Sequence, residues 1–456
     1  MSIALQGLDS KLKSTSISIF VTSKHPMILL GNALNWQKLA DLAIPDLRQT
    51  TKMGFWWLGR RLQLRTHLGI YILQSLLKET DRGIESRVKD TPVYQVFCGR
   101  SVLFNWKCPD HTKIEEFRNR LSPDTQQKIG VLVVQVAQQF GFADPSWMDV
   151  DSTVQEANIA YPSDATLMKK LSEKAFKVLN YLKDKKKNFF PQELQIDIQQ
   201  IRKKSQAYFF MAQNSATEIK RKRFASFHGL VCRQLMPTIS ILESIHPRQI
   251  SKLPWNIQQH LQQIQQKGRQ YLSDVGHFVR KNSIKPGKLL AFHAEEVSCI
   301  SKKKAGKPNE FGRVFQLGRI GGNFLIAFSS TSIRMEDKLS LLAVIEEHRR
   351  IFGTDVLKEV GTDKGYYSDK NIRQIEAHSI NAAGVQRPMN IKTQLPFEVI
   401  KPLRDRRAGI EPLIGHAKAF GLAKSRMKSD RATLASGYRS VLGFNLSQLI
   451  RHIEAG

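Results

Sequence analysis

One stretch, Trp147–Asn158, constrains the fold more than any other part of the chain. Its hydrophobic period shifts towards two, with apolar residues on one face and Asp149 and Asp151 on the other. This alternation predicts a β-strand that carries acids. Pro162 and Ser163 follow, and they are typical of the start of a helix.

Helical patterns lie on both sides of this strand. An N-cap candidate, Asp110, opens one predicted helix, and a second amphipathic helix runs from about Asp124 to Phe140. From Ala165 to about Asn282, apolar residues again recur at steps of three or four. We therefore predict an all-helical N-terminal domain at residues 1–145 and a helical insertion at about 165–285.

Strand patterns return after the insertion. The predicted elements are a strand at Leu289–Phe292, a hairpin that turns at Gly321-Gly322, a helix at Leu339–Phe352, a short strand from Val356 that ends at Asp363, and a helix at Asp369–Ala377. Residues 146–456 therefore form a second domain of mixed α and β structure, and the helical insertion follows its first strand.

The charge of the chain indicates its partners. The chain has 70 Lys and Arg and 40 Asp and Glu, which gives a formal net charge of +30. Such an excess favours a polyanion such as DNA, because phosphate neutralisation releases counterions. An anionic membrane is the rival, but no run of about eighteen apolar residues and no secretory signal pattern occurs. We expect a soluble cytoplasmic protein, associated with the bacterial nucleoid. A basic cluster such as Lys220–Arg223 is either a solvated face or a nucleic-acid contact.

Cysteine and histidine give little sign of a metal site. The four cysteines form no Cys-x-x-Cys pair, so neither a zinc module nor a disulfide framework is indicated. The group His293, Glu295 and Glu296 could hold a metal, but the polar end of a strand is the favoured interpretation.

The segment Arg404–Lys418 places a carboxylate among cations. If Arg407, Glu411 and Lys418 share one helix, all three point to one side. Such a setting keeps an acid ionised, suits a metal ligand and leaves cations for phosphate groups. The alternative is a solvated basic helix with one internal ion pair. Pro412 leaves a further alternative open, in which the helix begins at Glu411 and a loop places Arg407.

Three carboxylates, Asp151, Asp363 and Glu411, each lie beside a predicted element. Carboxylates of this kind can hold two magnesium or manganese ions that promote phosphoryl transfer. Asp149 competes with Asp151, because both point to the same side of the strand. Asp164 and Asp369 are predicted to be helix N-caps.

Motifs in several parts of the chain resemble one family. They are Asp151–Asp164, Thr362–Ser368, the set Arg407, Glu411 and Lys418, and the N-terminal Asp81–Glu85, Phe97–Gly99 and Pro109–Thr112. Together they are similar to the motifs of insertion-sequence transposases of the DDE type. The family's signature of Tyr, Arg, Glu and Lys has Arg404 here at the tyrosine position, so the contact of that ring with DNA is changed.

The resemblance implies an α/β (α+β) fold, a ribonuclease-H-like catalytic domain with a helical insertion at residues 146–456, preceded by a helical DNA-binding domain at residues 1–145. It implies a transposase that binds terminal inverted repeats, cleaves DNA and transfers the 3′ ends to target DNA. Asp151, Asp363 and Glu411 would be catalytic and hold two Mg²⁺ or Mn²⁺ ions.

The resemblance also implies that Arg404, Arg407 and Lys418 bind DNA, and that the active complex is a homodimer or higher oligomer. Two alternatives remain: a catalytically inactive DNA-binding descendant of such an enzyme, and a stand-alone nuclease of the same fold.

Overall fold

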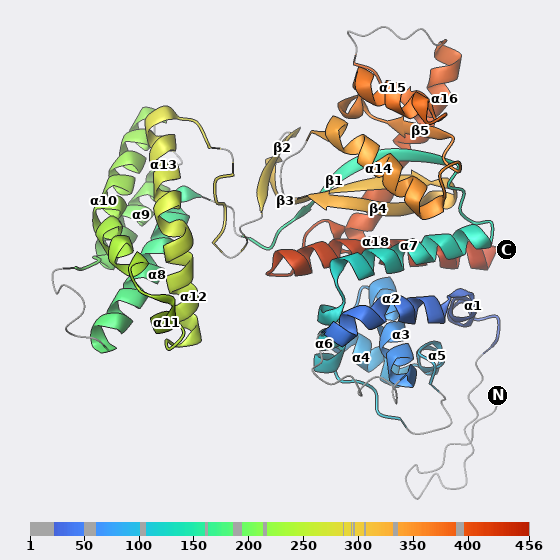
Figure 1. Cartoon of the computed structure of the whole chain (residues 1–456), viewed down its shortest axis with the longest axis horizontal. Coiled ribbons are helices and arrows are strands. Elements are labelled where there is room, and N and C mark those ends of the chain that lie inside the picture. The colour runs from blue at the N-terminus through green and yellow to red at the C-terminus, as the bar shows by residue number, and fades with distance from the viewer. Residues whose placement is uncertain are drawn as a thin grey trace, which may run out of the picture. The chain divides into compact units, whose positions relative to one another are not determined.

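The structure is a computed structural model, and it is mostly helical with one mixed sheet (Figure 1). It describes residues 22–49, 61–100, 106–159, 163–185, 194–212, 217–285, 287–292, 294, 297–304, 307–331, 336–388 and 396–455. Pro162 and the predicted group His293, Glu295 and Glu296 lie outside these residues. Within the described part of the chain, no helix is both long enough and apolar enough to cross a membrane.

The chain divides into two compact units. Residues 1–158 and 299–456 form one, here called the sheet unit, and residues 159–298 form the other, here called the helical unit. The sheet unit contains both the predicted N-terminal domain and the sheet, so a separate domain at residues 1–145 stays a prediction.

The sheet has six strands in the order β2-β3-β1-β5-β6, with β4 paired to β3. Strand β1 is antiparallel to β3 and parallel to β5, and β5 is parallel to β6. The strand bounds are β1 Trp147–Glu156, β2 Ser298–Lys304, β3 Lys307–Ile320, β4 Phe324–Thr331, β5 Glu359–Thr362 and β6 Asn381–Val385. The acid-bearing strand therefore lies inside the sheet, between β3 and β5.

Most strand predictions are confirmed, and one is wrong. The alternating stretch forms β1, and β3 and β4 form the predicted hairpin, where Gly322 adopts a φ of 76°. Leu289–Phe292 is not a strand. Phe292 instead packs in the core of the helical unit, with its ring edge-on to Tyr271 at 5.3 Å. A short apolar run does not distinguish a strand from a loop that fills a core.

The two faces of the sheet pack against different helices. Apolar residues such as Met148 and Val150 belong to a core shared with α14 (Asp337–Phe352) and α7 (Pro123–Gln139). The opposite face packs on α17 (Ile410–Ala417) and α18 (Asp430–Ala455) through residues such as Phe315 and Leu317. Asp149 and Asp151 lie on this second face, because side chains alternate along a strand.

Helix α18 joins the sheet to the N-terminal helices. Its Asn445 amide accepts a hydrogen bond from the Leu325 N–H at 3.0 Å and donates one to the Leu325 carbonyl at 2.6 Å, which pairs the backbone of this residue at the edge of β4. Figure 1 shows α18 and α7 between the sheet and the remaining N-terminal helices. These are α1 Pro26–Ala33, α2 Trp36–Gln49, α3 Arg61–Leu77, α4 Asp81–Asp90, α5 Pro92–Phe97 and α6 His111–Arg120.

Two N-cap predictions for acids are wrong and one is confirmed. Asp110 caps α6 by accepting from Thr112 N and Lys113 N. At α8 (Asp164–Lys185), however, the Ser163 hydroxyl accepts from the N–H of Thr166, and Asp164 pairs with Lys288. At α15 (Asp369–Ala377), Ser368 is the cap and Asp369 is the first helical residue.

The helical unit is a bundle of consecutive helices. They are α8 Asp164–Lys185, α9 Ile198–Ala212, α10 Thr217–Glu243, α11 Pro247–Ile250, α12 Trp255–Gln263 and α13 Arg269–Lys281, with a π-helical turn at Ile264–Gly268 between the last two. Their apolar stripes form one core, as the spacing predicts.

Candidate active site

Two of the predicted acids, Asp151 and Asp363, lie at the ends of neighbouring parallel strands. Strands β1 and β5 are parallel, and their last register pair is Val150 with Thr362. Asp151 and Asp363 are the next residues on the two chains, so the register brings them side by side. Asp363 directly follows β5, and its carboxylate accepts a hydrogen bond from Gly365 N at 2.9 Å, which holds the turn after the strand.

Arg407 connects the third acid to the first. Its Nη2 donates to Asp151 Oδ2 at 3.2 Å and its Nη1 donates to Glu411 Oε1 at 3.3 Å. The side chain of Arg407 is only 12% exposed, whereas that of Glu411 is 65% exposed. A buried cation therefore bridges an acid on the sheet and an acid that faces solvent.

The structure excludes the alternative in which a loop places Arg407. Arg407 lies in the last turn of α16 (Phe397–Ala408), and no loop places it. Helix α17 begins at Ile410, so Glu411 and Pro412 are both in its first turn. Proline is accepted there because the first N–H groups of a helix have no partner inside the helix.

A cavity of about 880 Å³ adjoins these residues. Its lining includes four cations, Lys364, Arg387, Arg404 and Arg407, and two acids, Asp363 and Glu376. Guanidinium and ammonium groups in this arrangement suit phosphate oxygens. The sequence analysis did not select Lys364 and Arg387 as site residues. Each lies two residues after the end of a parallel strand, β5 or β6, and ligands commonly bind at these ends in α/β sheets.

Lys418 is placed by a different element from the other cations. It follows Ala417 as the first residue of a π-helical turn, Lys418–Leu422, after α17. Its side chain is half-buried. Its proposed contact with DNA stays a prediction.

Asp149 has a structural environment that Asp151 lacks. It is fully buried, with Arg406 Nη2 at 3.0 Å and Arg319 Nη1 at 3.7 Å from its carboxylate. Burial raises the pKa of Asp149, and the charge of Arg406 opposes that shift. Arg406 also pairs with Glu359 and lies 4.5 Å from the centre of the Trp147 ring. Asp149 therefore anchors α16 to the sheet, and the next residue, Arg407, is thereby held at Asp151.

Gly361 makes room for this anchor. It is the register partner of Asp149 on β5, and a Cβ added there would lie 2.5 Å from Asp149 Oδ1. We expect Gly361→Ala to lower the free energy of unfolding by about 1–3 kcal/mol, because the buried ion pair must shift. Urea unfolding measures this value.

Gly415→Ala is the matched control for that experiment. Its added methyl group meets no atom within 4 Å on the surface of α17, so stability should be unchanged or slightly raised. Equal stability of the two variants would contradict the role given to Gly361.

The residues present fit a divalent metal in chemical type. Asp151, Asp363 and Glu411 supply the carboxylate oxygens that magnesium and manganese prefer. A cationic group, the Arg407 guanidinium, already contacts two of them. Across the described ranges, no three His, Cys, Asp or Glu side chains stand close enough together to hold a metal ion as they lie.

Comparison with known proteins concerns the N-terminal part. Residues 15–120 match the family model described as "Transposase domain (DUF772)". The match supports a transposase family. The chain is also 30% identical over 107 residues to "Uncharacterized protein ORF8 in nfe locus" of Rhizobium meliloti, a stretch that covers 23% of this chain and 51% of that protein. The chain thus spans about half the length of this curated relative. No solved structure matches it.

Acids of the N-terminal motifs hold the helices of the matched transposase region together. Glu85 accepts hydrogen bonds from His111 N at 2.8 Å and pairs with Lys89, which ties α4 to the start of α6. Asp81 pairs with the buried Arg118 of α6. These motif residues therefore hold α4 against α6 within the matched region.

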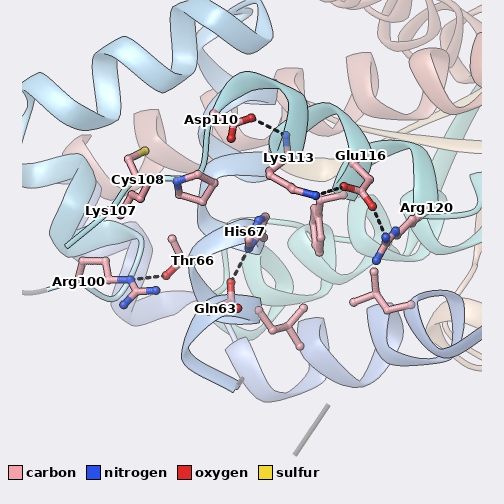
Figure 2. A pocket seen from close by; sticks show the side chains of 14 residues that line it. Gln63, Thr66, His67, Arg100, Lys107, Cys108, Asp110, Lys113, Glu116 and Arg120 are labelled. Carbon is pink, nitrogen blue, oxygen red and sulfur yellow. Dashed lines mark hydrogen bonds and ion pairs between the residues drawn. The ribbon is translucent and has the colours of Figure 1, made fainter. Parts of the chain in front are cut away.

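A second cavity, of about 510 Å³, lies within the matched region (Figure 2). Figure 2 shows that Glu116 contacts both Lys113 and Arg120, while Arg100 donates to Thr66 Oγ1 at 2.7 Å. Burial lowers the pKa of His67, so its ring is neutral at neutral pH. The cations thus outnumber the acids at this cavity, and most of them already have partners inside it.

Proposed function

We propose that the chain is a DDE-type transposase whose catalytic domain has a ribonuclease-H-like fold. The observation that carries the proposal is the position of Asp151 and Asp363 at neighbouring points of parallel strands, with Glu411 connected to Asp151 through Arg407. The mixed sheet and the N-terminal match to a transposase domain support it independently.

The proposed roles follow from charge and position. Asp151, Asp363 and Glu411 would hold two Mg²⁺ or Mn²⁺ ions, which when bound supply an activated water or 3′-hydroxyl and stabilise the leaving oxygen. Lys364, Arg387 and Arg404 would bind phosphates along the cavity, and Lys418 would bind the DNA end beyond Glu411. Arg407, which also lines the cavity, would orient Asp151 and Glu411 and bind a DNA phosphate. Residues 1–145 would recognise the terminal repeats, and the active complex would be a homodimer or higher oligomer.

A cleavage and joining assay tests this function. The full chain is incubated with magnesium and DNA that carries the inverted repeats flanking its reading frame, together with a target plasmid. We expect cuts at the repeat ends and products in which those ends are joined to the plasmid. Cutting without joining would favour a nuclease, and specific binding without cutting would favour an inactive descendant. Absence of DNA binding would overturn the proposal.

Two cations of the site should act on DNA binding alone. We expect Arg404→Gln or Lys418→Gln to weaken binding to repeat-end DNA about 3- to 10-fold, because each removes one phosphate contact. The Arg451→Gln variant, which removes one exposed charge from α18, is the control. Gel-shift titrations at fixed salt measure all three. Equal affinities of the three variants would show that neither cation contacts the DNA.

A further inference from the structure

The helical unit is more basic than the rest of the chain. Residues 159–298 contain 24 Lys and Arg against 10 Asp and Glu, which leaves 46 against 30 elsewhere from the totals of 70 and 40. The unit is less than a third of the length but carries nearly half of the net charge. A core of ordinary helix packing does not require such an excess, so it indicates a partner.

Three helices of the unit meet at one end through an aromatic cluster. Phe224 of α10 lies 5.5 Å from the ring of Tyr208 on α9 and 6.1 Å from that of Phe278 on α13. Lys204 donates to Ser226 Oγ at 3.3 Å, which fixes α9 beside α10. The last turns of α9 and α13 are thereby held at the level of the first turns of α10 (Figure 1).

Exposed cations gather where these turns meet. We call this surface the basic end, and it consists of Arg221 and Lys222 in the first turns of α10 and Arg280 and Lys281 in the last turn of α13, all of them exposed. Between Ile198 and His228 the sequence has seven Lys and Arg and one acid, Glu218, which pairs with Lys222 at 3.0 Å. Like charges this close repel one another unless an anion neutralises them.

Exposed apolar side chains stand among the cations. Phe210 is 76% exposed, Ile219 45% and Phe209 41%. Two of the three are phenylalanines in the last turn of α9. Aromatic faces beside cations are the combination that binds unpaired bases, because the rings stack on the bases while the cations neutralise the phosphates.

We propose that the basic end binds DNA at unpaired bases, such as those exposed where a strand has been cut or opened. Phe210 stacks on a base, and Arg221 and Lys281 bind the adjoining phosphates. The inference rests on the proposed transposase function, because it assigns the helical unit a part in holding the same DNA. It also gives a reason for the high charge of this unit.

Affinity measurements on the full chain test the inference with two probes, a plain duplex and the same duplex with a short single-stranded gap. We expect Phe210→Ala to weaken binding of the gapped DNA about 10-fold and to leave the plain duplex within about twofold. Trp255→Ala is the matched control, since Trp255 is 75% exposed in the same unit but begins α12, beyond the far end of α10.

Charge variants give a second, independent readout. Arg221→Gln with Lys281→Gln should weaken binding of the gapped DNA about 10- to 100-fold and reduce the slope of log affinity against log salt by about 2. Arg248→Gln with Lys252→Gln removes the same charge from exposed positions in and after α11, and it should change neither quantity appreciably. Circular dichroism and size-exclusion profiles confirm that each variant folds.

The outcomes separate this inference from the proposed function. If the wild type binds and cuts DNA but both sets of basic-end variants match their controls, the basic end is not a DNA surface and the transposase proposal stands. If the Phe210→Ala variant changes the oligomeric state and not the affinity, the exposed phenylalanine belongs to an interface between copies. If the wild type binds no DNA, the proposed function itself fails.

Discussion

Alanine at Asp151, Asp363 or Glu411 is expected to reduce DNA cleavage by about three to four orders of magnitude while DNA binding survives. Each change removes a carboxylate from the candidate site and leaves every cation of the cavity in place. Cleavage depends on the geometry of all three acids, whereas binding depends on phosphate contacts. Cleavage of repeat-end DNA with magnesium, beside a gel shift on the same preparations, measures both quantities.

The reductions in cleavage caused by the three single substitutions should not multiply when the substitutions are combined. A triple variant should be about as inactive as each single one, because the acids act as a unit. Glu411→Ala is the most informative single change, since its side chain is 65% exposed and its loss should leave folding intact. Near-normal cutting by this variant would exclude the proposed site. Asp369→Ala serves as a control carboxylate in the first turn of α15, and it should cut normally.

Replacement of Asp149 by alanine is expected to lower the free energy of unfolding by about 3 kcal/mol. The change leaves Arg406 and Arg319 without the buried carboxylate that both contact, and it opens a gap between β1 and α16. Arg406 keeps its ion pair with Glu359, so the loss should fall short of that for a wholly unpaired buried charge. Urea unfolding monitored by circular dichroism measures the value.

Two further variants separate structure from catalysis in this pair of acids. Asp149→Asn retains an oxygen that accepts hydrogen bonds from Arg406, so it should destabilise less than alanine and should still cleave DNA. Asp151→Ala should change stability by less than about 1 kcal/mol, because its carboxylate is partly exposed and Arg407 keeps Glu411 as a partner. Full loss of cutting in Asp149→Asn, with cutting retained in Asp151→Ala, would move the first catalytic acid by two residues.

Local patterns predicted the elements whose signals lie within a few residues. The alternation around Asp151, the glycine turn of the β3–β4 hairpin and the cap at Asp110 all survive in the structure. Each of these features depends on local backbone geometry or on an N–H group a few residues away in the sequence. The acids Asp164 and Asp369 show the limit of this reasoning, because a serine directly before each helix takes the cap instead.

Sequence by itself determined that acids stand on one face of an early strand, that a glutamate near the end of the chain stands among cations, and that a helical stretch separates the strands. It could not distinguish Asp149 from Asp151, since two residues on the same face of a strand carry the same pattern. Only the tertiary structure shows that their surroundings differ, because Arg319 and Arg406 contact the first while Arg407 joins the second to Glu411. Strand register likewise brought Lys364 and Arg387 to the cavity, since pairing between distant strands sets which residues meet.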